Sequence, residues 1–147
     1  MTGSGQGDDR YWAATLFNRV WTLLDRAERT GAEDVEMIHL VHASRAHWQA
    51  AGGPREWAIG EWQVARVYCA VGRAEPALFH ARLAADLAAD GGLGAFLAAS
   101  TQEGLARALR LAGEAEDAAR VEAAARSWLD RIEDAEERAV VEADLAG

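Results

Sequence analysis

Three glycines at equal spacing, Gly31, Gly72 and Gly113, divide this chain into segments of similar length. Each is followed three residues later by an acidic residue, and the stretches around them are rich in helix-forming residues. Glycine can take the left-handed conformation that ends a helix, and an acid near the start of the next helix suits the positive end of its dipole. The pattern therefore predicts three turns that each join two helices.

The segment 60–86 is the clearest of these helix pairs, because apolar residues recur at helical spacing on both sides of Gly72. Several of its small residues return about 41 residues later: Ala65, Ala77 and Ala84 correspond to Ala106, Ala118 and Ala125. A single pair of helices cannot bury its apolar face alone. We therefore predict a stack of three antiparallel helical hairpins with a C-terminal capping helix.

The composition favours the all-α class, since Ala, Leu, Glu and Arg dominate and proline occurs only twice. We expect residues 1–7, which are polar and glycine-rich, to be a disordered tail, and residues 8–147 to form a single α-helical repeat domain. The expected helices run from a cap at Asp8 or Asp9 to Thr30, then over 33–51, 54–71, 75–89, 95–111 and 116–131, with a short last helix capped by Asp134.

Charge and motifs exclude several classes of function. A net charge of −9 argues against nucleic acid as a partner, because phosphates need clustered basic residues. The single cysteine, Cys69, excludes an intramolecular disulfide and a cysteine-based zinc site. No signal peptide, membrane-spanning run, phosphate loop or nucleophile motif is evident. We expect a cytoplasmic protein without a membrane partner, and no reaction follows from the sequence.

A family resemblance rests on small and aromatic positions around two of the turns. These positions resemble the tetratricopeptide repeat at Val64, Ala65, Tyr68, Gly72, Ala77 and Ala84, and again in part at Gly113, Ala118 and Ala125. The repeat length of about 41 residues exceeds the usual 34, and the proline that ends a tetratricopeptide unit is absent. The resemblance covers 54–131 and implies a helical scaffold in which the first helix of each hairpin lines a concave surface. The chain also resembles small bacterial proteins of this type, which imply no activity.

Five residues of the expected third helix are candidates for a binding groove: Trp57, Glu61, Trp62, Arg66 and Tyr68. An aromatic floor with one acid and one arginine can hold a peptide, a protein partner or a small ligand. The alternative is a solvated ion pair above a core of tryptophans, of which the chain has six. Apolar surface at the ends of the stack is also compatible with a homo-oligomer.

Histidines supply a second, different hypothesis. Three lie on the expected second helix and one on the fourth, at His39, His42, His47 and His80. At about 100° per residue the first three can share a broad helix face. Neutral imidazoles bind zinc and other transition metals, so this set is a candidate metal site. The alternative is that they serve in packing or lie on the surface, with no cofactor.

Overall fold

Seven α-helices and one short 3-10 helix follow one another in a computed structural model that describes residues 2–147, and no strand occurs in that range. The helices are α1 (Thr2–Leu24), α2 (Gly31–Ala51), α3 (Pro54–Ala70), α4 (Ala74–Asp90), α5 (Ala95–Leu111), α6 (Ala115–Trp128), η1 (Leu129–Arg131) and α7 (Ala135–Ala146). The predicted all-α class is confirmed.

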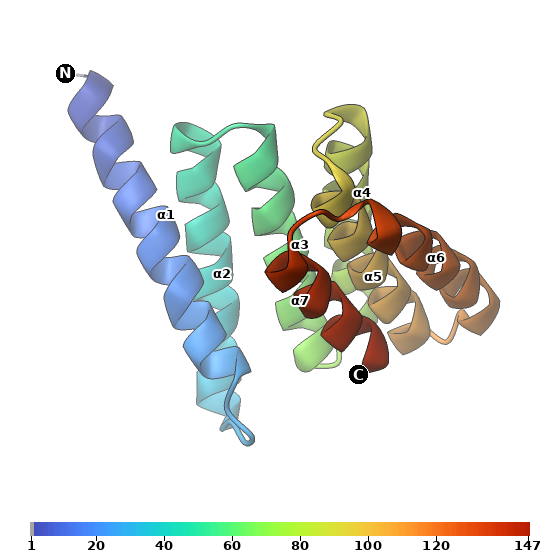
Figure 1. Cartoon of the computed structure of the whole chain (residues 1–147). Helices are drawn as coiled ribbons and strands as arrows, with labels where there is room; N and C mark the ends of the chain where they lie inside the picture. The colour runs from blue at the N-terminus through green and yellow to red at the C-terminus, as the bar shows by residue number, and fades with distance from the viewer. Residues whose placement is uncertain (1) are drawn as a thin grey trace.

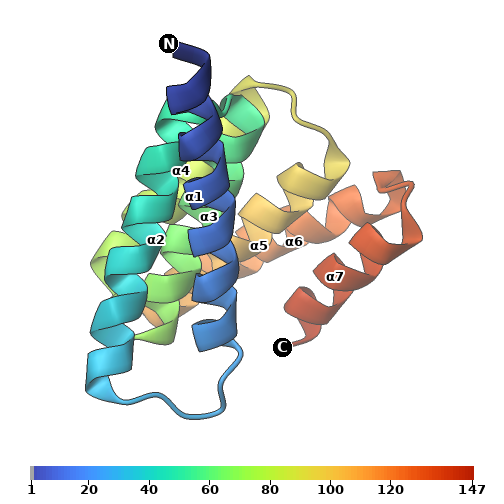
Figure 2. The same cartoon turned by 90° about the vertical axis from the view of Figure 1, so that its left-hand side faces the viewer.

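Consecutive helices run in opposite directions and lie side by side from α1 to α6 (Figures 1 and 2). Helix α3 also touches α1 and α5, so these three odd-numbered helices form an inner layer, while α2, α4 and α6 lie outside it. After η1 the chain turns back, and α7 packs against α5 on the inner side. This arrangement leaves one face of the inner layer only partly covered by α7.

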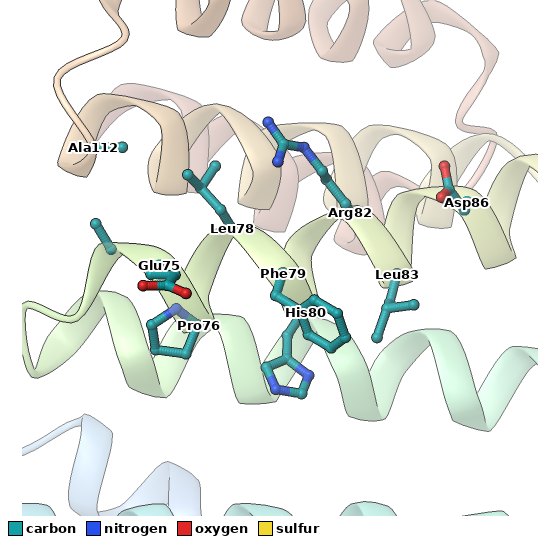
Figure 3. A pocket seen from close by; sticks show the side chains of 10 residues that line it. Glu75, Pro76, Leu78, Phe79, His80, Arg82, Leu83, Asp86 and Ala112 are labelled. Carbon is teal, nitrogen blue, oxygen red and sulfur yellow. The ribbon is translucent and has the colours of Figure 1, made fainter.

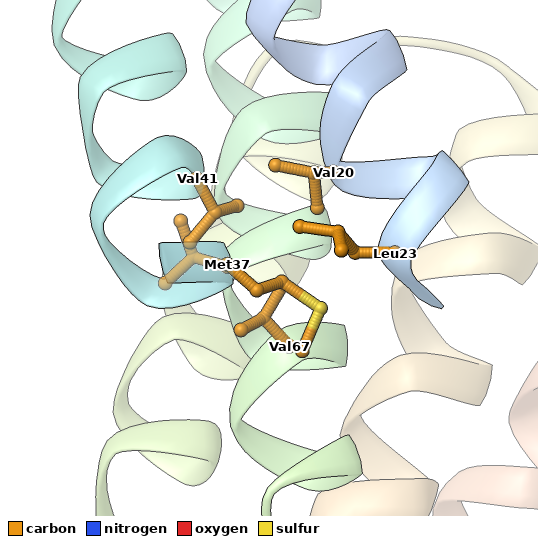
Figure 4. Close-up of a cluster of buried hydrophobic side chains, with 6 residues drawn as sticks. Val20, Leu23, Met37, Val41 and Val67 are labelled. Carbon is orange, nitrogen blue, oxygen red and sulfur yellow. The ribbon is translucent and has the colours of Figure 1, made fainter. Parts of the chain in front are cut away.

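Small and branched side chains hold the layers together. Figure 4 shows part of the largest core cluster, which joins α1, α2 and α3 through Val20, Leu23, Met37, Val41, Val64 and Val67. Alanines replace these larger residues between α3, α4 and α5, at Ala65, Ala77, Ala81 and Ala108. Side chains this small allow close approach of helix backbones. Together the two clusters surround α3 with α1 and α2 on one side and with α4 and α5 on the other.

The turns at Gly72 and Gly113 are equivalent, as the sequence predicts, but the turn at Gly31 is not. Gly72 and Gly113 have φ angles of 76° and 81°, in the left-handed region. Gly31 is instead the first residue of α2, because Thr30 and Glu33 form a capping box around it. Helix α1 already ends at Leu24, so a longer segment connects the first two helices.

The start of α1 also differs from the expectation. The helix begins at Thr2, so Asp8 and Asp9 lie inside it and the prediction that either caps it is wrong. Gly5 and Gly7 are exposed in the segment predicted to be a tail, and a side chain at either would meet no neighbour. Residue 1, which the predicted disordered tail includes, lies outside the described residues. None of the described helices is long and apolar enough to cross a membrane.

Alanine substitutions distinguish the two kinds of glycine. We expect Gly113→Ala to lower the free energy of unfolding by about 1 kcal/mol, because a side chain is strained at positive φ. Gly31→Ala is the matched control and should be neutral or slightly stabilising, since alanine favours a helix. Urea unfolding of both variants measures the difference. Equal destabilisation by the two would contradict the assignment of Gly31 to α2.

Candidate functional site

An apolar cavity of about 310 Å³ lies between α1, α3, α5 and α7. Its walls are aromatic and aliphatic apart from one serine: Phe17 and Trp21 from α1, Ile59 and Trp62 from α3, Phe96, Leu97 and Ser100 from α5, and Val140 from α7. We call this the apolar cavity. Ligand sites of this kind are concave and mostly apolar, with few polar groups.

A close contact between α3 and α5 sets the position of one wall. The indole of Trp62 lies over Gly104, where a Cβ atom would stand 3.0 Å from Cδ1 and 3.3 Å from Nε1. The absence of a side chain on Gly104 therefore lets Trp62 lie close to the backbone of α5. The ring of Trp21 also packs against Trp62, with 5.7 Å between their centroids.

Arg66 borders the apolar cavity one helical turn after Trp62. Its guanidinium lies 5.7 Å from the ring centroid of Trp21 and 5.9 Å from that of Trp62, within the range of a cation–π interaction. A carboxylate oxygen of Asp144 on α7 lies 3.5 Å from Arg66 Nη1. The predicted neighbours Trp62 and Arg66 thus lie on the same side of α3, next to α7.

The structure divides the other predicted binding residues between different sides of α3. Trp57 donates a hydrogen bond from Nε1 to the carbonyl oxygen of Trp48 (2.9 Å) and packs toward α2. Glu61 and Tyr68 bond to residues of α2 and α4 instead. Because α3 has neighbours on several sides and successive residues are rotated by about 100°, the five candidates do not form a single groove.

A buried carboxylate links three helices at Glu61, which is 7% exposed. It accepts hydrogen bonds from Arg45 Nε on α2 (3.0 Å) and His80 Nδ1 on α4 (2.7 Å). Burial alone would raise the pKa of Glu61, but the hydrogen bond and charge of His80, together with Arg45, hold this pKa below its ordinary value. Glu61 therefore remains ionised and ties α3 to both outer neighbours.

A second hydrogen bond extends this polar cluster. His42 Nε2 and the Tyr68 hydroxyl are 2.8 Å apart, and the Tyr68 ring stacks on His80 at a centroid distance of 5.9 Å. Burial, and then the charge of His80, lower the pKa of His42. The neutral imidazole of His42 is thus the favoured form inside the fold.

The four histidines do not form the predicted metal site. His42 and His80 approach each other, with 5.5 Å between ring centroids, but His47 bonds to Asp9 (2.7 Å) and His39 is exposed. Within residues 2–147, no three His, Cys, Asp or Glu side chains are grouped so that they could hold a metal ion. His47 faces Asp9 on α1, whereas His42 faces Tyr68 and His80, which separates His47 from the other two.

A wider hollow of about 740 Å³ follows the outer side of α4 (Figure 3). All of its lining residues except Ala112 belong to α4, including the exposed Phe79 and Leu83. In Figure 3, Leu78 and Arg82 point to one side of the helix and His80 to the other. One helix cannot enclose a ligand, so the apolar cavity is the stronger candidate site.

Most walls of the apolar cavity were not identified from the sequence. Among the wall residues, Trp62 is the one predicted as a binding residue; Phe17, Phe96 and Val140 belong to helices that are distant in the chain. No protein-family model, curated protein or solved structure matches this chain. Its function therefore has to be argued from this geometry.

The lowered pKa of His42 predicts that stability depends on pH. His42 faces Glu61 and Tyr68 on α3 and His80 on α4, and its ordinary pKa is 6.5. Because the folded state binds this proton less readily than the unfolded chain, the contribution of His42 is fully present above pH 6.5 and declines as the pH falls below it.

Urea unfolding at about pH 7.5 and about pH 5.5 measures this effect. The difference in free energy of unfolding between the two conditions should be smaller for His42→Gln than for the wild type. His39→Gln, on an exposed position of the same helix, is the control; the charge of His39 is the smallest cause of the lowered pKa of His42, so this variant should retain most of the wild-type difference. An unchanged difference in His42→Gln would contradict the prediction.

Proposed function

We propose that this protein is a non-enzymatic, tetratricopeptide-like helical scaffold that binds a small ligand in the apolar cavity near α3. In this proposal α1–α2, α3–α4 and α5–α6 are three stacked hairpins and α7 is the capping helix. Support comes from the equivalent turns at Gly72 and Gly113 and from the layer that α1, α3 and α5 share. The first helix of each hairpin then lines the binding face.

The observation that carries the proposal is the apolar cavity itself. Its walls are almost entirely apolar and come from four helices, and its volume of about 310 Å³ matches the lower end of the range of known ligand sites. Its wall residue Val140 is half exposed, which places part of the cavity rim at the surface.

The alternative function, metal binding, has no comparable support. It requires the histidines to converge, and the structure brings only His42 and His80 together. Both already bond to protein side chains, at Tyr68 and Glu61. We therefore develop only the proposal of a small ligand.

Binding of n-octanol tests the cavity, because this probe is apolar and small enough to enter it. Its affinity is measured by isothermal titration calorimetry, and its location from the indole N–H signals of Trp21 and Trp62 in NMR spectra. We expect Trp62→Ala to weaken binding by about tenfold or more, because a large aromatic wall is lost. Trp12→Ala is the matched control, since Trp12 is exposed on α1 outside the cavity.

A second variant tests the site by filling it. Ser100 lies on the cavity wall and is nearly buried, so Ser100→Leu should occupy the space and abolish octanol binding while retaining the helical circular dichroism spectrum. Octanol binding that neither Ser100→Leu nor Trp62→Ala affects would mean that the apolar cavity is not the binding site.

A further inference from the structure

A second cavity, of about 400 Å³, lies beside the C-terminal halves of α3 and α5. Three of its six lining residues are arginines, Arg66, Arg107 and Arg110, and the others are Cys69, Ala70 and Leu111. In a chain with a net charge of −9, three guanidinium groups therefore surround one cavity, and each has a carboxylate nearby. We call it the arginine cavity.

Arg66 connects the two cavities. It lines the arginine cavity, and its guanidinium also lies against Trp21 and Trp62, which are walls of the apolar cavity. Trp62 and Arg66 are four residues apart on α3, which corresponds to a rise of about 6 Å along the helix. The two cavities therefore lie next to each other along α3, with the Arg66 side chain between them.

The guanidinium groups keep hydrogen-bonding capacity that the protein does not use. Arg66 Nη1 and Arg107 Nε are buried and have no hydrogen-bond partner within residues 2–147. Each arginine has a carboxylate neighbour: Arg107 bonds to Glu103 (3.0 Å), Arg110 to Glu122 (2.9 Å), and Arg66 lies 3.5 Å from Asp144. The contact of Arg66 is the longest of the three, so Asp144 is the partner most easily replaced.

The carboxylates inside this region compensate the arginines incompletely. Glu103 is fully buried, and its Oε1 has no hydrogen-bond partner in the described part of the chain. Burial raises the pKa of Glu103, although Arg107 and Arg66 act in the opposite direction. A carboxyl group with a raised pKa stays protonated, and therefore uncharged, up to a higher pH than a solvated one, and the uncharged form does not compensate a guanidinium.

We infer that the ligand carries an anionic group, a carboxylate or a phosphate, which binds in the arginine cavity while its apolar part occupies the apolar cavity. This inference rests on the proposed function and names the class of ligand, an amphipathic anion. The planar guanidinium groups match both anions, because each can donate two parallel hydrogen bonds to them. On binding, the anion takes the place of Asp144 as the partner of Arg66.

Three probes with the same alkyl chain separate the contribution of the anionic group to the affinity from that of the alkyl chain. They are n-octanol, n-octanoate and n-octyl phosphate, each titrated by isothermal calorimetry into the full chain. We expect at least one anion to bind about tenfold more tightly than octanol, as hydrogen bonds to a charged group allow. Tighter binding of octanoate indicates a carboxylate, and tighter binding of octyl phosphate indicates a phosphate. Equal affinities of all three probes overturn the inference.

Arginine variants locate the anion, with the ratio of anion affinity to octanol affinity as the readout. Arg66→Gln and Arg110→Gln should reduce this ratio several-fold, and Arg110 is exposed, so its replacement should not disturb folding. Arg120→Gln is the control, because it removes the same charge from an exposed site on α6 outside both cavities. An unchanged ratio in both cavity variants overturns the inference.

Asp144→Asn provides a test in the opposite direction. Asp144 competes with the ligand for Arg66, so this variant should bind the anion several-fold more tightly and octanol equally well.

The experiments distinguish failure of the further inference from failure of the proposed function. If octanol binds and Trp62→Ala weakens it, but the anions gain nothing, only the inference fails. If an anion binds through Arg66 and Arg110 and is indifferent to Trp62→Ala, the apolar cavity is not the ligand site and the proposed function fails.

Discussion

The enclosed position of α3 is the constraint on which the other features depend. Helices α2, α4 and α5 pack around it, and α1 touches it from the inner layer, so few of its side chains reach solvent freely. A polar side chain that is buried on α3 needs a hydrogen-bond partner on a neighbouring helix, because leaving a buried polar group unpaired lowers the stability of the fold. Glu61 finds Arg45 and His80, and Gln63 donates a hydrogen bond to the carbonyl oxygen of Phe17. These bonds fix how α3 is rotated, and that rotation turns Trp62 and Arg66 toward α5 and α7.

The two sides of α3 therefore differ: one packs closely against its neighbours, and the other borders the two cavities. Toward α2 and α4 it carries a closed polar cluster in which Glu61, His80, His42 and Tyr68 satisfy one another. Such a hydrogen-bonded cluster favours one packing arrangement of the three helices. Toward α1, α5 and α7 it carries space, aromatic surface and the guanidinium of Arg66, whose Nη1 has no hydrogen-bond partner in the described part of the chain. The unsatisfied side is the one on which binding is expected.

The sequence predicts those parts of this structure that depend on local signals. The turns at Gly72 and Gly113 follow from a residue that tolerates positive φ, and the helices from 54 onward follow from periodicity. Gly31 misled the prediction because the same acidic neighbourhood also contains Thr30 and Glu33, whose capping box makes the glycine part of a helix. The cavity walls were not predictable, since contacts between Trp21, Trp62 and Phe96 arise only when α1, α3 and α5 form one layer.

Gly104 gives the apolar cavity a property that its lining residues alone do not reveal. The indole of Trp62 lies against the backbone of α5 at this point. The width of the apolar cavity therefore depends on Gly104 having no side chain. A single methyl group there would meet the indole at 3.0 Å and force Trp62 to shift. If the proposed ligand binds here, Gly104 is then one determinant of the ligand size that fits. A protein of this architecture could be adapted to a narrower ligand by one substitution that never touches the ligand.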